Sequence, residues 1–147
     1  MYEGGKAHDS VLMFVVVASW DDVRQTALSL PETTEAVSWG NAHWRVKDKG
    51  FVWERPLNHS DHAALKALGA AAGGAILGVR VADLGVKDVL IADDPELFFT
   101  IPHFNGYPAI LVRLDLIGVA ELEELIVEAW LDRAPKRLAQ QYLDKLP

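Results

Sequence analysis

Cysteine is absent from the 147 residues of this chain. Disulfide bonds, cysteine-based zinc sites and thiol catalysis are therefore excluded. A chain without thiols is compatible with a reducing compartment, and we expect a cytoplasmic location. Long apolar runs are also missing: the run at residues 11–18 has eight residues, far fewer than the roughly 20 that a membrane helix requires. We expect no membrane partner.

The usual catalytic motifs are missing as well. No Gly-x-Ser-x-Gly nucleophile elbow and no Gly-x-Gly-x-x-Gly phosphate loop occurs. His59 and His62 flank Asp61, but two histidines at this spacing without a third ligand are a weak metal motif. His103 and Tyr107 could form an acid–base pair, although we favour a structural role in bracing their loop. We therefore predict a non-enzymatic protein with no metal and no cofactor.

The charge is unevenly distributed. Fourteen Lys and Arg face 21 Asp and Glu, a net charge of −7, which argues against strong general attraction to nucleic acid. Residues 42–55 nevertheless carry four basic and two acidic residues, and residues 133–145 carry four basic and one acidic. These two segments are the candidates for a local basic patch.

Periodicity and turn residues predict an α+β fold. Ser19, Ser60 and Asp83 are expected to cap helices, and the helices predicted from these and later signals begin near residues 20, 62, 83, 119 and 136. Strands are expected at residues 35–39, 42–47, 51–55 and 75–82, and a hairpin at 98–116. Because these elements do not alternate as βαβ units, we predict two layers, an antiparallel sheet with helices packed on one face. The other face should be partly open.

The 98–116 hairpin organises this picture. Pro102 and Pro108 bracket its loop, and Asn105-Gly106 supplies the positive φ angles of a sharp reversal. The strand after Pro108 alternates between apolar residues and positions such as Arg113. The loop would present His103, Asn105 and Tyr107.

Strand alternation also assigns side chains to the two faces of the sheet. Trp44, Val46, Phe51 and Trp53 are expected to face the helices. The opposite face would then collect His43, Arg45, Lys47, Arg80, Leu111 and Arg113. Guanidinium groups on three strands suit phosphates or carboxylates. The alternative is that they are solvated positions that pair with Glu54 or Asp115 across strands.

The length indicates one domain, assigned to residues 19–147. Residues 1–18 form an N-terminal extension with three interpretations: an extra strand or ordered arm, a start placed upstream of the true one, with Met13 as a candidate, or a targeting segment. The first is favoured.

Several segments match a known family in order. They are Trp20–Arg24, Ala27–Glu32, Trp39-Gly40, Lys49–Phe51, Asp94–Thr100, Pro102–Ala109, Leu111–Leu114, Glu128–Trp130 and Ala134–Leu138. The Pro-His-x-x-Gly-Tyr-Pro loop and the Ala-Pro-Lys-Arg segment are the more specific pieces. On these residues the chain resembles the MmcQ/YjbR family from about Trp20 to Leu143.

The resemblance implies a fold similar to type III secretion chaperones, and a DNA-binding label that rests on a double wing of hairpins. It supplies no catalytic residues. The wings would be residues 42–55 and 98–116, presenting Arg45, Lys47, Lys49 and Arg113.

Three functions remain open: nucleic-acid binding, a dimeric protein-interaction or chaperone-like module that uses the open face or edge strands, and a small-anion pocket at Arg80, Arg113 and His103. The candidate nucleic-acid or anion ligands are Arg45, Lys47, Lys49, Arg80, Arg113, Lys136 and Arg137. The candidate loop and pocket residues are His43, His103, Asn105 and Tyr107.

Overall fold

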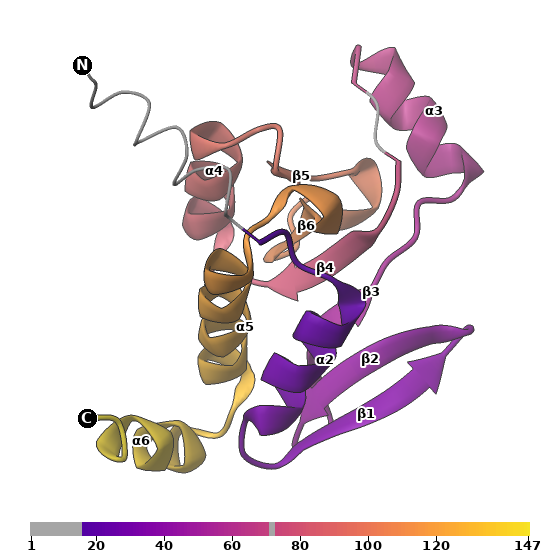
Figure 1. Ribbon diagram of the computed structural model, residues 1–147. Coiled ribbons are helices and arrows are strands. Elements are labelled where there is room, and N and C mark those ends of the chain that lie inside the picture. The colour runs from indigo at the N-terminus through magenta and orange to yellow at the C-terminus, as the bar shows by residue number, and fades with distance from the viewer. Residues whose placement is uncertain (1–15, 71–72) are drawn as a thin grey trace, which may run out of the picture.

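The computed structural model describes residues 16–70 and 73–147 (Figure 1). Its helices are α2 (Trp20–Ser29), α3 (His59–Ala67), α4 (Leu84–Asp93), α5 (Val119–Arg133) and α6 (Lys136–Asp144). Its strands are β1 (Thr33–Ser38), β2 (Asn41–Val46), β3 (Lys49–Glu54), β4 (Ile76–Arg80), β5 (Phe98–Phe99) and β6 (Ala109–Arg113). Two 3-10 turns, η1 (Pro102–Phe104) and η2 (Leu114–Leu116), flank β6.

The six strands form one sheet in the order β1-β2-β3-β4-β6-β5, and every pairing is antiparallel. The predicted α+β class with an antiparallel sheet is therefore confirmed. β1 and the two-residue β5 are the edge strands.

The main core lies between the sheet and helices α2 and α5. Alternate residues of β6, Ile110 and Val112, are fully buried in it beside Trp130 of α5. Residues of α4 and α6 pack around its margin. Burial of this many large apolar side chains supplies the main driving force for folding.

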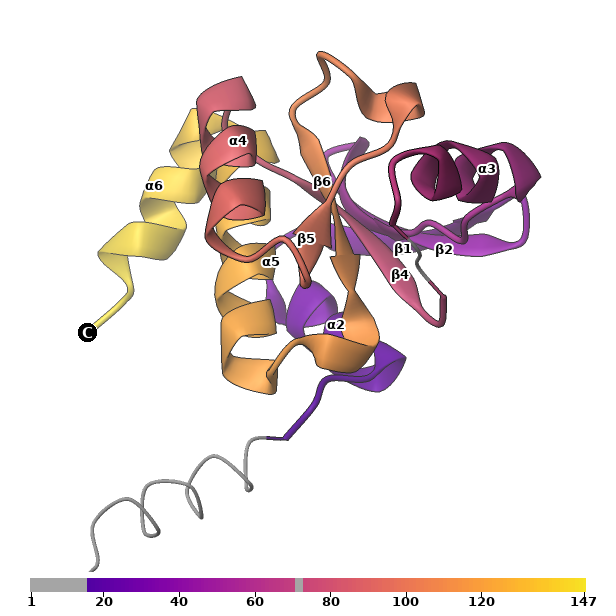
Figure 2. The same ribbon diagram turned by 90° about the horizontal axis from the view of Figure 1, so that it is seen from above.

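The opposite face of the sheet carries a second, smaller cluster. Leu65 from α3 and Phe104 from η1 cover Ile76, Phe99 and Leu111 there. Figure 2 shows α3 on the side of the sheet away from α2 and α5. The face that the sequence predicted to be partly open is therefore covered in part by α3 and by the loop around η1.

The prediction that Trp53 faces the main core is wrong. A register shift between Trp44 and Arg45 places an extra residue in β3, so that Phe51 and Val52 are both fully buried in the main core. A β-bulge of this kind reverses the alternation of the strand beyond it. Trp53 consequently lies on the opposite face, across from His43.

Helix starts agree with the sequence at two of three sites. Ser19 and Asp22 form a capping box at α2, and the Asp83 side chain accepts from Val86 N at α4. The prediction that Ser60 caps the helix expected near residue 62 is wrong. Asn58 is the cap and Asp61 completes the box, so α3 begins earlier than expected.

The end of the predicted N-terminal extension contacts the domain. Val17 forms a bridge with Gly118, and Ala18 donates from its N–H to Ile117 O at 2.9 Å and is buried. The rest of the predicted extension, residues 1–15, lies outside the described residues. Within residues 16–70 and 73–147, no helix has the length and apolarity to cross a membrane.

Candidate binding groove

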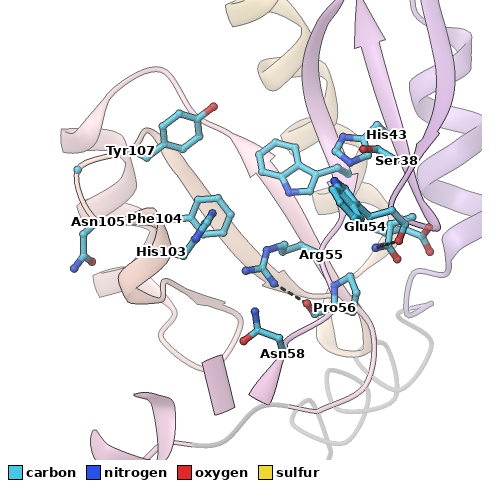
Figure 3. A pocket seen from close by; sticks show the side chains of 14 residues that line it. Ser38, His43, Glu54, Arg55, Pro56, Asn58, His103, Phe104, Asn105 and Tyr107 are labelled. Atoms are coloured by element: carbon cyan, nitrogen blue, oxygen red, sulfur yellow. Dashed lines mark hydrogen bonds between the residues drawn. The ribbon is translucent and has the colours of Figure 1, made fainter. Parts of the chain in front are cut away.

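A groove of about 890 Å³ lies on the sheet face away from α2 and α5. Three segments form it: the β1–β2 turn with the start of β2, the end of β3 with the start of α3, and the loop around η1. In Figure 3 His103, Phe104 and Tyr107 lie on one side, and Ser38 and His43 on the other. The lining residues are Ser38, Trp39, Asn41, His43, Trp53, Glu54, Arg55, Pro56, Asn58, His103, Phe104, Asn105, Gly106 and Tyr107.

Aromatic side chains form much of the lining. Trp53 stacks beside His43, with ring centroids 6.4 Å apart and planes 11° apart, because the two residues are a cross-strand pair of β2 and β3. Trp53 also meets Phe104, at 6.3 Å between centroids. Gly78 of β4 lies beneath the indole, where no side chain would fit. The missing Cβ at Gly78 therefore lets Trp53 lie against the sheet.

The loop at residues 102–107 is held by two cations from neighbouring elements. Lys87 of α4 is 5% exposed and donates from Nζ to the carbonyl oxygens of Phe104 at 2.6 Å and Tyr107 at 2.9 Å. Arg80 of β4 donates to the Tyr107 hydroxyl at 2.7 Å. Burial lowers the pKa of Lys87, and Asp88 partly opposes that effect. The loop is thus a fixed wall of the groove.

Tyr107 and His103, both predicted to brace the loop, make different contacts in it. Tyr107 takes part through its hydroxyl and its carbonyl. His103 is exposed and packs edge-on against Phe104, with centroids 4.9 Å apart. No sequence motif distinguishes Lys87 from a solvated lysine of a helix, so its role in holding the loop was not predicted.

An ion pair fixes the floor at the α3 end. Arg55 donates to Asp61 Oδ2 at 2.9 Å and to Pro56 O at 2.6 Å, and its guanidinium lies 5.5 Å from the centre of the Phe104 ring. The Asp61 carboxylate also accepts from Asn58 N–H. Because Asp61 is only 5% exposed, this pair joins the β3 end rigidly to the start of α3.

His43 is the titratable group at the centre of the groove. Burial and the neighbouring Arg45 lower its pKa from 6.5, while Glu54 opposes them. Glu54 itself accepts from Ala42 N–H at 2.6 Å. His43 is therefore neutral at pH 7 and presents an uncharged aromatic ring.

Trp39 is the most exposed aromatic side chain of the groove. It is 97% exposed and has a positive φ of 55° in the turn between β1 and β2. Its indole is therefore free to contact a ligand in the groove. The sequence singled out Trp39-Gly40 as a family feature but not as a site residue.

The predicted basic residues do not converge. Arg45 lies beside His43 on the groove face, and Lys49 is exposed at the β2–β3 turn. Lys47 in the same turn pairs with Glu32 at 2.6 Å. Lys136 and Arg137 are exposed on α6, whose apolar residues pack on the main core, so they lie across the sheet from Arg45.

Arg80 and Arg113 lie at opposite ends of the β4–β6 ladder, opposite Ala109 and Ile76 respectively. Arg113 donates from Nε to Glu96 O at 2.7 Å, and its guanidinium lies 4.4 Å from the centre of the Phe99 ring. Burial lowers the pKa of Arg113. The expected grouping of Arg80, Arg113 and His103 is therefore not formed.

The expected cross-strand partners of the arginines have other roles. Glu54 binds the backbone of β2, and Asp115 accepts from Ala75 N–H at 3.4 Å. His59 and His62 are exposed on α3. Over residues 16–70 and 73–147, no cluster of three or more His, Asp or Glu residues has the arrangement of a metal site.

Comparison with known proteins places this chain in a family. A solved structure, Deinococcus radiodurans protein DR2400 with a DUF419 domain, matches with a TM-score of 0.59 at 17% identity, covering 78% of each chain, and so shares the fold. The uncharacterized proteins Mb2600 of Mycobacterium bovis and Rv2570 of Mycobacterium tuberculosis are each 53% identical over 128 residues, covering 86% of this chain and 97% of theirs. The family model YjbR matches residues 28–131. The chain therefore belongs to the YjbR family.

Proposed function

We propose that this chain is a non-enzymatic binding module that takes single-stranded nucleic acid in its groove. The observation that carries the proposal is the run of aromatic rings, Trp39, His43, Trp53, Phe104 and Tyr107, along one open groove. Bases stack on such rings with little dependence on sequence. Arg45, near His43 but outside the groove lining, would supply a contact to the phosphate backbone.

Unpaired strands suit this surface better than a duplex. A double-wing contact with duplex DNA needs free cations on both hairpins. Residues 98–116 contain one Arg and no Lys, and that residue, Arg113, donates to Glu96 O at 2.7 Å. On the other hairpin Lys47 is paired with Glu32. Phosphate contacts supply most of the affinity for duplex DNA, so two wings of this composition would bind it weakly. Aromatic rings can engage bases only where the bases are unstacked.

Fluorescence anisotropy with a labelled ten-nucleotide thymidine strand tests the proposal. We expect binding that weakens as NaCl rises from about 50 to 200 mM. Replacing Trp39→Ala should weaken binding by about 5- to 150-fold, the equivalent of 1–3 kcal/mol for one stacked base. Leu68→Ala removes an exposed apolar side chain outside the groove lining and serves as the control.

Replacing Arg45→Gln should weaken binding and reduce the salt dependence by about one phosphate contact. Lys66→Gln makes the same charge change on α3, outside the groove lining, and should leave the salt dependence unchanged. Absence of salt-sensitive binding at micromolar protein would rule the proposal out.

Self-association through β1 is a second candidate. β1 is a six-residue edge strand that contains no Pro or Lys, the usual protection of an edge. Antiparallel pairing of two copies about Ala36 sets Glu35 opposite Val37 of the second copy and keeps like charges apart. Val37 is 72% exposed and would be covered.

Light scattering after size exclusion tests this second candidate. We expect a dimer at about 100 μM that Ala36→Lys converts to monomer, because two lysines would face each other across the axis. Leu68→Lys is the control. A parent protein that is monomeric at this concentration would exclude the candidate.

A further inference from the structure

The groove is lined by two imidazoles and by few side chains of fixed charge. Its lining contains His43 and His103, one carboxylate, Glu54, and one guanidinium, Arg55. The positive charge of Arg55 is matched within the protein, because its guanidinium forms an ion pair with Asp61 at 2.9 Å. When both imidazoles are uncharged, the lining therefore keeps one uncompensated charge, the negative charge of Glu54.

The two histidines stand on opposite walls of the groove. In Figure 3 His103 lies beside Phe104 on the loop side, and His43 lies on the side of the β1–β2 turn. His43 is fixed on β2, where it pairs with Trp53 of β3. The loop that carries His103 is fixed by Lys87, which donates to the Phe104 carbonyl oxygen. A ligand that fills the groove between these walls therefore lies beside both imidazole rings.

The charged neighbours of His43 come from two strands. Burial lowers the pKa of His43 most, Arg45 of the same strand lowers it further, and Glu54 of β3 opposes both effects. Its cross-strand partners, Ala36 of β1 and Trp53 of β3, are uncharged. Because the shift is downward from 6.5, His43 gains its second ring proton only in mild acid.

His103 lies among neighbours from three elements. Lys87 of α4 donates to the Phe104 carbonyl oxygen, and Arg55 of β3 lies 5.5 Å from the centre of the Phe104 ring. Leu65 of α3 packs in the same cluster as Phe104. The titratable residues of α3 are His59, Asp61, His62 and Lys66. Histidine is the only side chain among these groups whose ordinary pKa lies between pH 5 and 8, so a fall in pH over that range changes the charge chiefly at the imidazoles.

We propose that the groove binds its nucleic-acid strand more tightly in mild acid than at neutral pH, with His43 and His103 as the groups that respond. The inference rests on the proposed function, because it takes the strand as the ligand. Two new positive charges beside the single negative charge of Glu54 change the lining from net negative to net positive, which favours phosphate groups. A protonated imidazole also donates from both ring nitrogens. Protonation of paired histidines is a common basis of pH-sensitive interfaces.

Fluorescence anisotropy at about pH 7.5 and about pH 5.5 tests the inference. The ligand is the ten-nucleotide thymidine strand, carrying a label that does not titrate in this range. Each new imidazolium should tighten binding by about 2- to 5-fold, the scale of an exposed ion pair, so the two together should give about 4- to 25-fold. The slope of log affinity against log salt concentration should also steepen in acid, by about 0.7 for each new phosphate contact.

The ratio of the two affinities, taken within each variant, separates the effect of protonation from any loss of stacking. His43→Phe keeps an aromatic ring that cannot gain a proton, and His103→Gln removes the second imidazole. Each variant should lower the ratio by the share of one imidazolium, and the double variant should bring it close to one. His62→Gln removes an imidazole of α3 outside the groove lining and should keep the ratio of the parent protein. Circular dichroism at both pH values shows whether each variant is folded.

The imidazoles themselves supply a second measurement. Because linkage is reciprocal, a strand that binds more tightly to the protonated groove must raise the pKa of the imidazoles in it. NMR titration of the ring C–H signals, assigned with the same variants, should show a higher pKa for His43 and His103 when the strand is bound. The pKa of His62 should not change.

Failure of the inference and failure of the proposed function give different results. Equal affinities at the two pH values overturn the inference and leave the proposed function standing. A double variant with the same ratio as His62→Gln does the same, since the acid response would then lie outside the groove. Absence of strand binding at both pH values refutes the proposed function, and the inference with it.

Discussion

Gly78 and Trp53 offer the sharpest test of how the groove is built. A Cβ added at Gly78 would lie 2.5 Å from Nε1 and 2.7 Å from Cζ2 of the Trp53 indole, which real Cβ atoms do not tolerate. Overpacking of this kind costs about 1–3 kcal/mol. The reduced entropy of the unfolded chain returns about 0.4–1 kcal/mol. Gly78→Ala should therefore lower the free energy of unfolding by about 1–2 kcal/mol, or Tm by about 3–8 °C.

Gly50→Ala in β3 is the matched control, because a Cβ there meets nothing within 4 Å. Thermal and urea unfolding should show Gly50→Ala to be as stable as the parent or slightly more stable. In a Trp53→Leu background the cost of Gly78→Ala should largely disappear. The reasoning is refuted if Gly78→Ala and Gly50→Ala are equally stable.

Three further predictions concern the supports of the groove and a carboxylate of α5. Lys87→Met should lower the free energy of unfolding by at least about 2 kcal/mol, because it leaves the buried Phe104 carbonyl without its donor. It should also speed amide hydrogen exchange at residues 102–107. Unchanged exchange there would contradict the bracing role of Lys87. Asn58→Ala should cost about 1 kcal/mol in urea unfolding through loss of the α3 cap, and Asn58→Asp should not; equal losses would mean that the cap is unimportant. Burial, Glu128 and Asp83 raise the native pKa of Asp132 above 3.8, so the protonated carboxyl stabilises the fold below about pH 3.8 and this stabilisation is lost as pH rises through the native pKa. Asp132→Asn should therefore be more stable than the parent at pH 7, and the difference in the free energy of unfolding should narrow in acid. A variant less stable than the parent at pH 7 would show that the Asp132 carboxylate is not destabilising.

Much of the fold follows from local sequence signals. The alternation after Pro108 puts Ile110 and Val112 in the main core, and the caps at Ser19 and Asp83 begin helices where expected. These features depend on residues within a few positions of each other. Local chemistry is sufficient to specify them.

The errors arise where distant parts of the chain decide the outcome. The bulge in β3 depends on pairing with β2 and turns Trp53 to the other face of the sheet. The sequence of β3 alone predicts a regular alternation of buried and exposed side chains. The separation of Arg80 from Arg113 depends on the pairing of β4 with β6, which sets the two residues at opposite ends of the ladder. Local periodicity does not encode strand pairing, so neither the face of Trp53 nor the position of Arg80 relative to Arg113 could be predicted from the sequence.

The most direct test of the central claim follows the indole N–H signals of the five tryptophans by NMR while the thymidine strand is added. Trp39 and Trp53 line the groove, whereas the indoles of Trp44 and Trp130 donate to Glu35 and to Pro31 O on the helix side. Substitution by Phe assigns each signal. The account predicts saturable shifts at Trp39 and Trp53 with Trp44 and Trp130 unchanged. Shifts confined to the other tryptophans, or none at all, would contradict it.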